Sequence, residues 1–238
     1  MDDQPGNNNP MIKAIFFDAA GILYTRQAHT EEYVLQRLQE EGVSTTIPEA
    51  MLQNQLELRS QANQGLVSHV VYWDRYLSLR GVINDQYRQE FISDIVNFSN
   101  NVQPIPGVRE TLAELKRRGF LLGIITDTMY PLEWKMRRLE KVDVADLIDI
   151  VACSSDLGVH KPDPVIYSHA LQQAHLSPGE AAFVGHLGIE LQGAHAAGMV
   201  TISVDPDLGE PADYRCRALP EVLTFPIMQA TQVKPVRG

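Results

Sequence analysis

The sequence predicts an α/β fold with a parallel sheet that carries helices on both faces, together with an inserted α-helical domain. From residue 104 onward, helix-like and strand-like segments alternate, and such alternation requires the crossover connections of a parallel sheet. A first apolar strand, residues 11–17, is separated from this alternating part by a long stretch of helical periodicity. A chain of 238 residues with 44% hydrophobic content is large enough for one such core and a smaller insert.

The first strand ends at a carboxylate. Residues 11–17 form a nearly continuous apolar run, which is typical of a strand buried on both faces. Asp18 follows directly, and Gly21 suits the sharp turn by which the chain leaves the sheet. Because open α/β sheets place their chemistry at the carboxyl ends of their strands, Asp18 is a candidate functional residue.

Residues 25–103 read as helices. Apolar residues recur at helical spacing in four successive segments, and prolines and a glycine at residues 104–107 end the stretch. We expect this stretch to be an insertion after the first strand that lies over the strand ends. The four segments cover residues 31–38, 48–61, 69–79 and 85–98.

Beyond the insertion, four helix–strand pairs follow one another. Each amphipathic segment precedes a short apolar strand, as in repeated crossover units. The expected helices cover residues 108–118, 131–141, 164–174 and 189–197, and the expected strands cover residues 120–125, 148–152, 181–185 and 200–204.

The balance of charges argues against two classes of partner. The formal net charge is −10 and the pI is about 5.1, whereas nucleic acids and anionic membranes both require a basic surface. We therefore expect neither as a partner. The two dense basic runs, residues 116–118 and 135–138, fall on expected helices and are interpreted as solvated faces.

Composition also favours a cytoplasmic protein. Residues 1–10 are polar and lack the charged and apolar regions of a secretory signal, so we interpret them as a disordered leader. The two cysteines, Cys153 and Cys216, have no metal-like spacing and are expected to be reduced thiols. No apolar run approaches the length of a membrane span.

Three later segments carry polar residues at the ends of expected strands or before an expected helix. The strand at residues 120–125 is followed by Thr126 and Asp127, and residues 158–164, GVHKPDP, contain Lys161. Residues 183–190 read FVGHLGIE and lead into a small-residue helix. Taken alone, Thr126 would be a helix cap and Lys161 a solvated side chain.

Together with the Asp18 segment, these motifs resemble the haloacid dehalogenase (HAD) superfamily from residue 11 to about residue 223. The resemblance implies a Rossmann-like core formed by residues 11–24 and 104–238. It implies that residues 25–103 are a helical cap that closes over the site and selects the substrate.

The resemblance also implies roles for individual residues. Asp18 would be the nucleophile that forms a covalent aspartyl intermediate. Thr126, with Asp127 beside it, would bind the anionic group of the substrate. Lys161 would steady the negative charges of Asp18 and of the substrate, and Tyr167 matches an aromatic residue of many relatives.

Two positions near Asp18 depart from the family pattern. The second position after the nucleophile usually carries an aspartate that acts as general acid, and here it is Ala20. General acid catalysis typically contributes about 10²–10⁴ to a rate, so alkyl phosphate esters should be poor substrates. Ile22, where relatives usually carry threonine, removes a hydroxyl near the nucleophile.

The expected metal site is altered as well. The resemblance implies a divalent metal held by Asp18, the backbone carbonyl of Ala20 and two acids of the fourth motif, which are His186 and Glu190 in this chain. Magnesium prefers oxygen ligands, whereas an imidazole with two carboxylates suits Mn, Fe, Co or Zn. The cofactor is therefore Mg or a transition metal, unless His186 serves only to hydrogen-bond Asp18.

Two branches of the superfamily share the altered second position. Phosphonoacetaldehyde hydrolase-like proteins need a cap lysine, and no lysine occurs between Lys13 and Lys116. The 2-haloacid dehalogenases dispense with the metal and carry an aromatic residue at that second position. Residues 18–21, Lys161 and Tyr167 look similar to that branch, but its fourth motif supplies Ser and Asn where this chain has His186 and Leu187. Cap residues that could hold a carboxylate in such an enzyme are Arg26, Arg59 and Arg75.

Two hypotheses about function follow. The first is a HAD-like hydrolase of a small anionic metabolite, phosphatase-like or dehalogenase-like, that uses Asp18 as nucleophile. The second is a catalytically inactive HAD scaffold that binds a ligand or a protein, since Ala20, Ile22 and His186 all depart from the family pattern in one pocket. The sequence identifies neither the substrate nor the oligomeric state.

Overall fold

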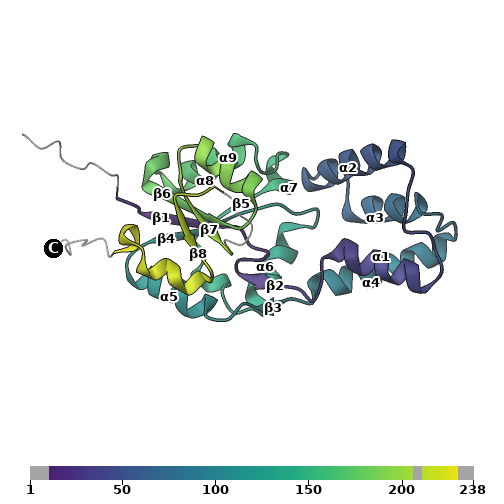
Figure 1. Ribbon diagram of the computed structural model, residues 1–238, viewed down its shortest axis with the longest axis horizontal. Coiled ribbons are helices and arrows are strands. Elements are labelled where there is room, and N and C mark those ends of the chain that lie inside the picture. The colour runs from purple at the N-terminus through teal and green to yellow at the C-terminus, as the bar shows by residue number, and fades with distance from the viewer. Residues whose placement is uncertain (1–10, 206–210, 230–238) are drawn as a thin grey trace, which may run out of the picture.

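The computed structural model describes residues 11–205 and 211–229 and contains a six-stranded, all-parallel sheet (Figure 1). The strand order is β5-β4-β1-β6-β7-β8. The leader predicted at residues 1–10 lies outside the described residues. The predicted α/β class is confirmed. The strands are β1 (Ala14–Phe17), β4 (Leu121–Thr126), β5 (Ile150–Cys153), β6 (Ala181–Gly185), β7 (Val200–Val204) and β8 (Tyr214–Cys216).

The central position of β1 sets the location of the site. Phe17, its last residue, pairs with Ile124 of β4 on one side and with Val184 of β6 on the other. Because all three strands are parallel, their carboxyl ends meet at one edge of the sheet. Asp18 therefore lies between the segments that follow β4 and β6.

Helices cover both faces of the sheet. Figure 1 shows α8 and α9 on one side and α5 and α6 on the other. The helices of this part are α5 (Val108–Arg117), α6 (Leu132–Lys141), α7 (Ser154–Leu157), α8 (Pro164–Ala174) and α9 (Gly188–Ala196). Short 3-10 turns lie at η1 (Ala145–Leu147), η2 (Pro178–Glu180), η4 (Leu219–Thr224) and η5 (Pro226–Met228).

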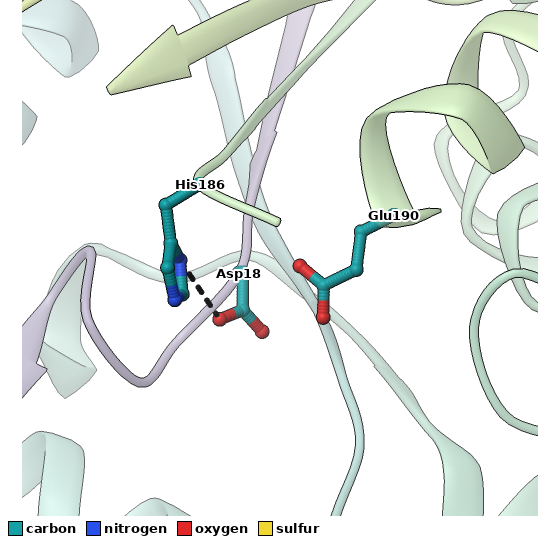
Figure 2. A group of neighbouring side chains, drawn as sticks. All are labelled: Asp18, His186 and Glu190. Carbon is teal, nitrogen blue, oxygen red and sulfur yellow. Dashed lines mark ion pairs between the residues drawn. The ribbon is translucent and has the colours of Figure 1, made fainter. Parts of the chain in front are cut away.

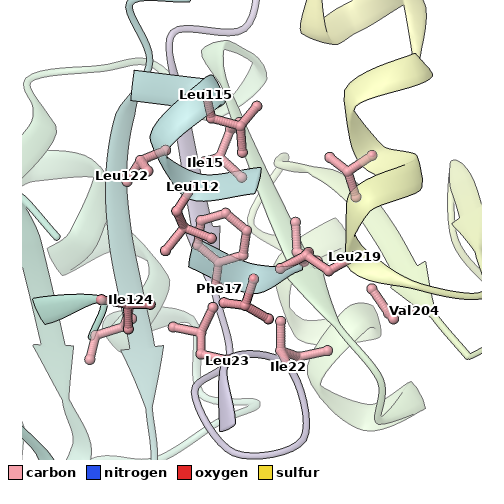
Figure 3. Close-up of a cluster of buried hydrophobic side chains, with 14 of the residues drawn as sticks. Ile15, Phe17, Ile22, Leu23, Leu112, Leu115, Leu122, Ile124, Val204 and Leu219 are labelled. Carbon is pink, nitrogen blue, oxygen red and sulfur yellow. The ribbon is translucent and has the colours of Figure 1, made fainter. Parts of the chain in front are cut away.

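Burial on both faces explains the unbroken apolar run of β1. Ile15 and Phe17 face the layer of α5, where they pack with Leu112 and Leu115 (Figure 3). Phe16 points to the opposite face and packs in the cluster beneath α8 and α9. A strand alternates its side chains between faces, so a strand covered on both sides must be apolar at every position.

The remaining helices form a separate layer at one end of the sheet (Figure 1). They enclose their own hydrophobic cluster, which includes Trp73, Tyr76, Phe91 and Ile95. We call this part the helical layer. It consists of α1 (Thr30–Glu40), α2 (Glu49–Asn63), α3 (His69–Ser78) and α4 (Asp85–Asn100).

The chain enters and leaves the helical layer through adjacent strands. β2 (Tyr24–Thr25) and β3 (Gln103–Pro104) form a two-stranded antiparallel ribbon. Cross-layer hydrogen bonds join the layer to the core, from Trp73 Nε1 to Tyr130 Oη at 3.1 Å and between Ser60 Oγ and His160 Nε2 at 2.9 Å. These contacts join the helical layer to the segments that follow β4 and β5 in the chain.

The predicted helices agree with the structure to within two residues at each end. The short strands β2, β3 and β8 were not predicted, because two or three residues carry no periodicity. The assignment of residues 25–103 as a cap domain stays a prediction. None of the helices in residues 11–205 and 211–229 combines the length and apolar character needed to cross a bilayer.

A glycine in β4 provides a test of the packing. Gly123 pairs with Phe16, and a Cβ placed there would lie 2.6 Å from two Phe16 ring atoms. We expect Gly123→Ala to lower the free energy of unfolding by about 1–3 kcal/mol, because the ring must move. Urea denaturation of Gly123→Ala in the wild-type and Phe16→Leu backgrounds measures this coupling. An equal cost in both backgrounds would contradict the proposed clash.

Candidate active site

A buried ammonium group joins two carboxylates at the edge of the sheet. Lys161 Nζ lies 2.6 Å from Asp18 Oδ1 and 2.8 Å from Glu190 Oε1. The Asp18 residue is 6% exposed and Lys161 is 4% exposed. The backbone N of Asp18 donates to the carbonyl of Val184 at 2.9 Å, which fixes the carboxylate between β1 and β6.

Local turn chemistry explains how Lys161 reaches this position. The chain ends α7 at Gly158, whose φ of 72° is left-handed and suits glycine. Asp163 then caps α8 by accepting a hydrogen bond from Val165 N at 2.9 Å, with Pro164 at the first helical position. Between these anchors, the backbone N of Lys161 donates to Asp127 Oδ1 at 3.1 Å.

The site carries more negative than positive charge. Burial alone would lower the pKa of Lys161, but the carboxylates of Asp18 and Glu190 raise it well above its ordinary value. Burial raises the pKa of Glu190 to about 7, although Lys161 opposes that change. Burial also raises the pKa of Asp127. One ammonium cannot balance three carboxylates, so Glu190 takes up a proton near neutral pH.

A cavity of about 590 Å³ lies directly above Asp18. Four side-chain polar atoms in residues 11–205 and 211–229 are buried without a hydrogen-bond partner, and three of them belong to residues lining this cavity. Buried polar groups are nearly always paired, so three unpaired atoms around one carboxylate indicate a ligand site. The three are Thr126 Oγ1, His186 Nδ1 and Glu190 Oε2.

His186 lies on the opposite side of Asp18 from Glu190 (Figure 2). Its ring packs on Gly21, where a Cβ would lie 2.8 Å from an imidazole carbon. His186 Nδ1 is 3.9 Å from Asp18 Oδ2, too far for a hydrogen bond. Burial lowers the pKa of His186, so the imidazole is neutral near pH 7.

The residues around Asp18 fit a divalent metal. One ligand atom each from Asp18, His186 and Glu190 lie within 4.8 Å of one another. The unpaired Nδ1 and Oε2 atoms are those that a metal would engage. Ala20 lines the same cavity, and the role of its carbonyl as a metal ligand stays a prediction. An imidazole with two carboxylates favours a borderline transition metal over magnesium.

Comparisons with known proteins identify the family of this chain. A family model of haloacid dehalogenase-like hydrolases matches residues 15–204. The chain belongs to the haloacid dehalogenase-like hydrolase family. The resemblance predicted from the motifs is thereby confirmed at the level of the family.

Individual relatives of this HAD-family chain carry two kinds of name. This chain is 29% identical over 202 residues to a glyceraldehyde 3-phosphate phosphatase of Methanopyrus kandleri, and the match covers 82% of this chain and 84% of the relative. A phosphatase of the same name from Pyrococcus furiosus is 28% identical over 229 residues, covering 89% and 92%. The solved 2-haloacid dehalogenase of Pseudomonas syringae pv. Tomato superimposes with a TM-score of 0.63 at 25% identity, covering 90% of this chain and 97% of that chain.

The structure brings most of the predicted site residues of this HAD-family chain together. Lys161 touches the same centre through Asp18 and Glu190. The hydroxyl of Tyr167 donates a hydrogen bond to the backbone carbonyl of Glu190 at 2.8 Å and so helps to hold Glu190 in place. The predicted residues that line the cavity are Asp18, Ala20, Arg26, Arg59, Thr126, Asp127, His186 and Glu190.

Three expectations were wrong. Ile22 is buried in the hydrophobic cluster beside β1 and does not line the cavity. Arg75 lines a different hollow between α2 and α3. Lys135 and Arg138 are each 2% exposed, so within this basic run only Arg137 is a solvated cation. They lie one turn apart on α6 beside Met136 and Leu139, and that spacing could have indicated a buried face.

The raised pKa of Glu190 predicts a pH-dependent stability. The folded protein holds the Glu190 proton more tightly than the unfolded chain, so the free energy of unfolding falls as pH rises from about 4.5 to about 7. Glu190→Gln lacks this titration, and its stability relative to wild type should rise across that window. Urea denaturation at stepped pH measures the difference, and parallel profiles for the two proteins would contradict it.

The metal cluster predicts cobalt binding. We expect titration with Co²⁺ to give a visible absorption band from the Asp18, His186 and Glu190 ligands. His186→Ala removes a direct ligand and should weaken Co²⁺ binding by at least about 10–100-fold. That is the loss of metal affinity usually caused by removing a residue that only hydrogen-bonds a metal ligand. His195→Ala, at an exposed histidine, is the control. Equal Co²⁺ affinity in both variants would rule out the cluster as the site.

Proposed function

We propose that this HAD-family chain is a phosphatase-like hydrolase of a small anionic substrate, with Asp18 as nucleophile. The observation that carries the proposal is the Asp18 carboxylate, which faces a cavity with one oxygen held by Lys161 and with unpaired polar atoms around it. The names of the relatives from Methanopyrus kandleri and Pyrococcus furiosus support a phosphate ester as the substrate class.

The reaction proceeds in two displacements. A carboxylate oxygen of Asp18 attacks phosphorus, the bond from phosphorus to the leaving oxygen breaks, and an aspartyl phosphate forms. Thr126 Oγ1 donates a hydrogen bond to a phosphoryl oxygen, and Lys161 offsets the negative charge that gathers between the two groups. Water then attacks phosphorus, which releases inorganic phosphate and restores the Asp18 carboxylate.

The leaving group must depart without a protein acid. Ala20 offers no proton donor at the position where the family usually has an aspartate. Rates for alkyl phosphates should therefore be lower by about 10²–10⁴ than for an enzyme that has this acid. Acyl and aryl phosphates, whose leaving groups are stable as anions, fit the site best.

A divalent metal would be held by Asp18, His186 and Glu190, and Ala20 lines the same cavity. When bound, such an ion supplies a Lewis acid that polarises a phosphoryl oxygen. The protein residues must still orient the Asp18 carboxylate, and Lys161 does this through the 2.6 Å contact to Asp18 Oδ1.

A second candidate is hydrolytic dehalogenation of a 2-haloacid. The observation that favours it is Ala20, because a halide leaves as an anion and needs no proton. Asp18 would displace the halide from carbon, and water would then attack the carbonyl carbon of the resulting ester. Arg26 and Arg59, which line the cavity, would hold the substrate carboxylate.

Substrate profiling of Asp18→Asn tests the proposal. We expect wild-type protein to hydrolyse acetyl phosphate and an aryl phosphate faster than an alkyl phosphate, and Asp18→Asn to lose nearly all of this turnover. Asp156→Asn, at an exposed aspartate, should keep it. The assays include 2-chloropropionate, and each runs with Mg²⁺, Mn²⁺, Co²⁺, Zn²⁺ or EDTA.

The possible outcomes separate the alternatives. Release of chloride in EDTA, with no phosphatase activity, would favour the dehalogenase. If no substrate class were turned over above the level of Asp18→Asn, the enzyme proposal would fall, and a non-catalytic HAD scaffold would be the better account of the pocket.

A further inference from the structure

Three cations besides Lys161 lie in or beside the Asp18 cavity. Lys135 lines the Asp18 cavity, and Arg138 lines an adjoining hollow of about 400 Å³ that shares Lys135 with it. Arg26 lines both. Lys135 and Arg138 are each 2% exposed, and Arg26 is half-buried. We call Arg26, Lys135 and Arg138 the cationic cluster.

The cationic cluster is held by neutral oxygens. Lys135 Nζ donates to Tyr24 Oη at 3.2 Å and lies 3.5 Å from the Asp127 carbonyl. Arg138 Nε donates to Asn100 Oδ1 at 3.0 Å, and Arg138 Nη2 donates to Ser99 Oγ at 3.3 Å. The Arg138 guanidinium also lies 4.8 Å from the centre of the Tyr130 ring.

No carboxylate in the described part of the chain lies within 4.0 Å of these three side chains. The acids that line the same hollows have other partners. Glu31 pairs with Arg59 at 2.8 Å, and Glu32 accepts a hydrogen bond from the backbone N of His29 at 3.1 Å. Asp127 accepts from the backbone N of Lys161.

Buried cations without a counter-charge are costly. Removing a charged group from water costs several kcal/mol unless an opposite charge compensates, and neutral oxygens and rings compensate only in part. Burial lowers the pKa of Arg138, in keeping with this cost. Lys135 and Arg138 are both buried, and the positive charge of the half-buried Arg26 acts on Arg138 as well. An arrangement of this kind is stable when an anion completes it.

We infer that the cationic cluster is a second anion subsite, which binds a carboxylate or a further phosphate of the same substrate that reacts at Asp18. The inference rests on the proposed function for the identity of the reacting end. Because Asp18 and Lys135 line one cavity, a single small molecule can reach both. The substrate class is therefore a small phosphate ester with a second anionic group.

Non-hydrolysable phosphonates test the subsite by binding alone. Phosphonoacetate and phosphonopropionate carry a carboxylate where ethylphosphonate and propylphosphonate carry a methyl group. Methylene- and ethylenebisphosphonate carry a second phosphonate. Isothermal titration of the full chain should show that one of the doubly anionic ligands binds at least about tenfold tighter than its matched alkylphosphonate, the value of one charge-assisted hydrogen bond.

Variants on α6 assign this preference to residues. Lys135→Met and Arg138→Gln should reduce the preference, measured in each variant as the ratio of its affinities for the doubly anionic ligand and the matched alkylphosphonate, to less than about threefold. Arg137→Gln and Lys141→Met, at exposed positions of the same helix, are the matched controls and should keep the preference. Arg26→Gln, at a half-buried position, serves as a further variant if the Lys135 or Arg138 variants fail to fold.

Two outcomes would overturn the inference. One is equal affinity of wild-type protein for the doubly anionic ligands and their alkylphosphonate partners. The other is that Tyr24 is ionised and its phenolate supplies the negative charge that balances the cationic cluster. Burial raises the pKa of Tyr24, but the neighbouring cations outweigh it and bring the net value below the ordinary one. A phenolate absorbance at neutral pH that disappears in Tyr24→Phe, with no ligand preference, would identify that residue as the balancing anion.

Failure of this inference and failure of the proposed function are distinguishable. If turnover of simple phosphate esters depends on Asp18 but ligands with a second anionic group bind no tighter, only the subsite inference is contradicted. If the binding preference depends on Lys135 but no ester is turned over, the subsite inference stands and the phosphatase proposal is contradicted.

Discussion

The contact of the Lys161 ammonium with Asp18 and Glu190 is the interaction on which the rest of the site depends. The two buried carboxylates both contact one ammonium group, and without that cation they would repel each other strongly. The turns from Gly158 to Asp163 position Lys161. The parallel pairing of β1 and β6 positions Asp18, which follows β1, near Glu190 on α9, which follows β6. The sheet therefore does more than support the site, because its strand order determines which charges meet.

Two groups of charged side chains line the cavity and the hollow beside it. Asp18, Asp127 and Glu190 outnumber Lys161, their single cation, while Lys135 and Arg138 are hydrogen-bonded to neutral groups. A ligand with an unsymmetrical charge distribution would be oriented by this field before any side chain moved. Orientation of this kind is an entropic contribution to catalysis, since the reacting atoms arrive already aligned.

Much of this arrangement could be predicted from the sequence. The alternating segments indicated the parallel sheet, and the apolar run before Asp18 indicated a central strand. The resemblance to the HAD superfamily implied that Asp18, Thr126 and Lys161 share one site, and the carboxyl ends of the parallel strands β1 and β4 place Asp18 and Thr126 at one edge of the sheet. The roles of these residues stay a proposal, because neither family membership nor position fixes the chemistry.

The parts that escaped prediction depend on tertiary contacts. Lys135 and Arg138 read as a solvated charge run, and only the burial of α6 against β2 and the helical layer places them at the cavity. Ile22 sits two residues from Ala20 yet packs into the core, since the turn at Gly21 reverses the chain. No local pattern in the sequence could distinguish these outcomes.

The ribbon of β2 and β3 has a consequence for how such a molecule can diversify. Tyr24 pairs with Pro104, so the two ends of the helical layer are neighbours in space although 80 positions of sequence separate them. Segments whose ends meet can be exchanged or lengthened with little disturbance of the parent fold. The helical layer, which contributes Arg59 and Asn63 to the lining of the cavity, could in this sense be replaced as one segment. Replacing this segment would change the side chains that it contributes to the cavity and would keep Asp18 and Lys161. Lys135 and Arg138 would also be kept, because they belong to α6 of the core.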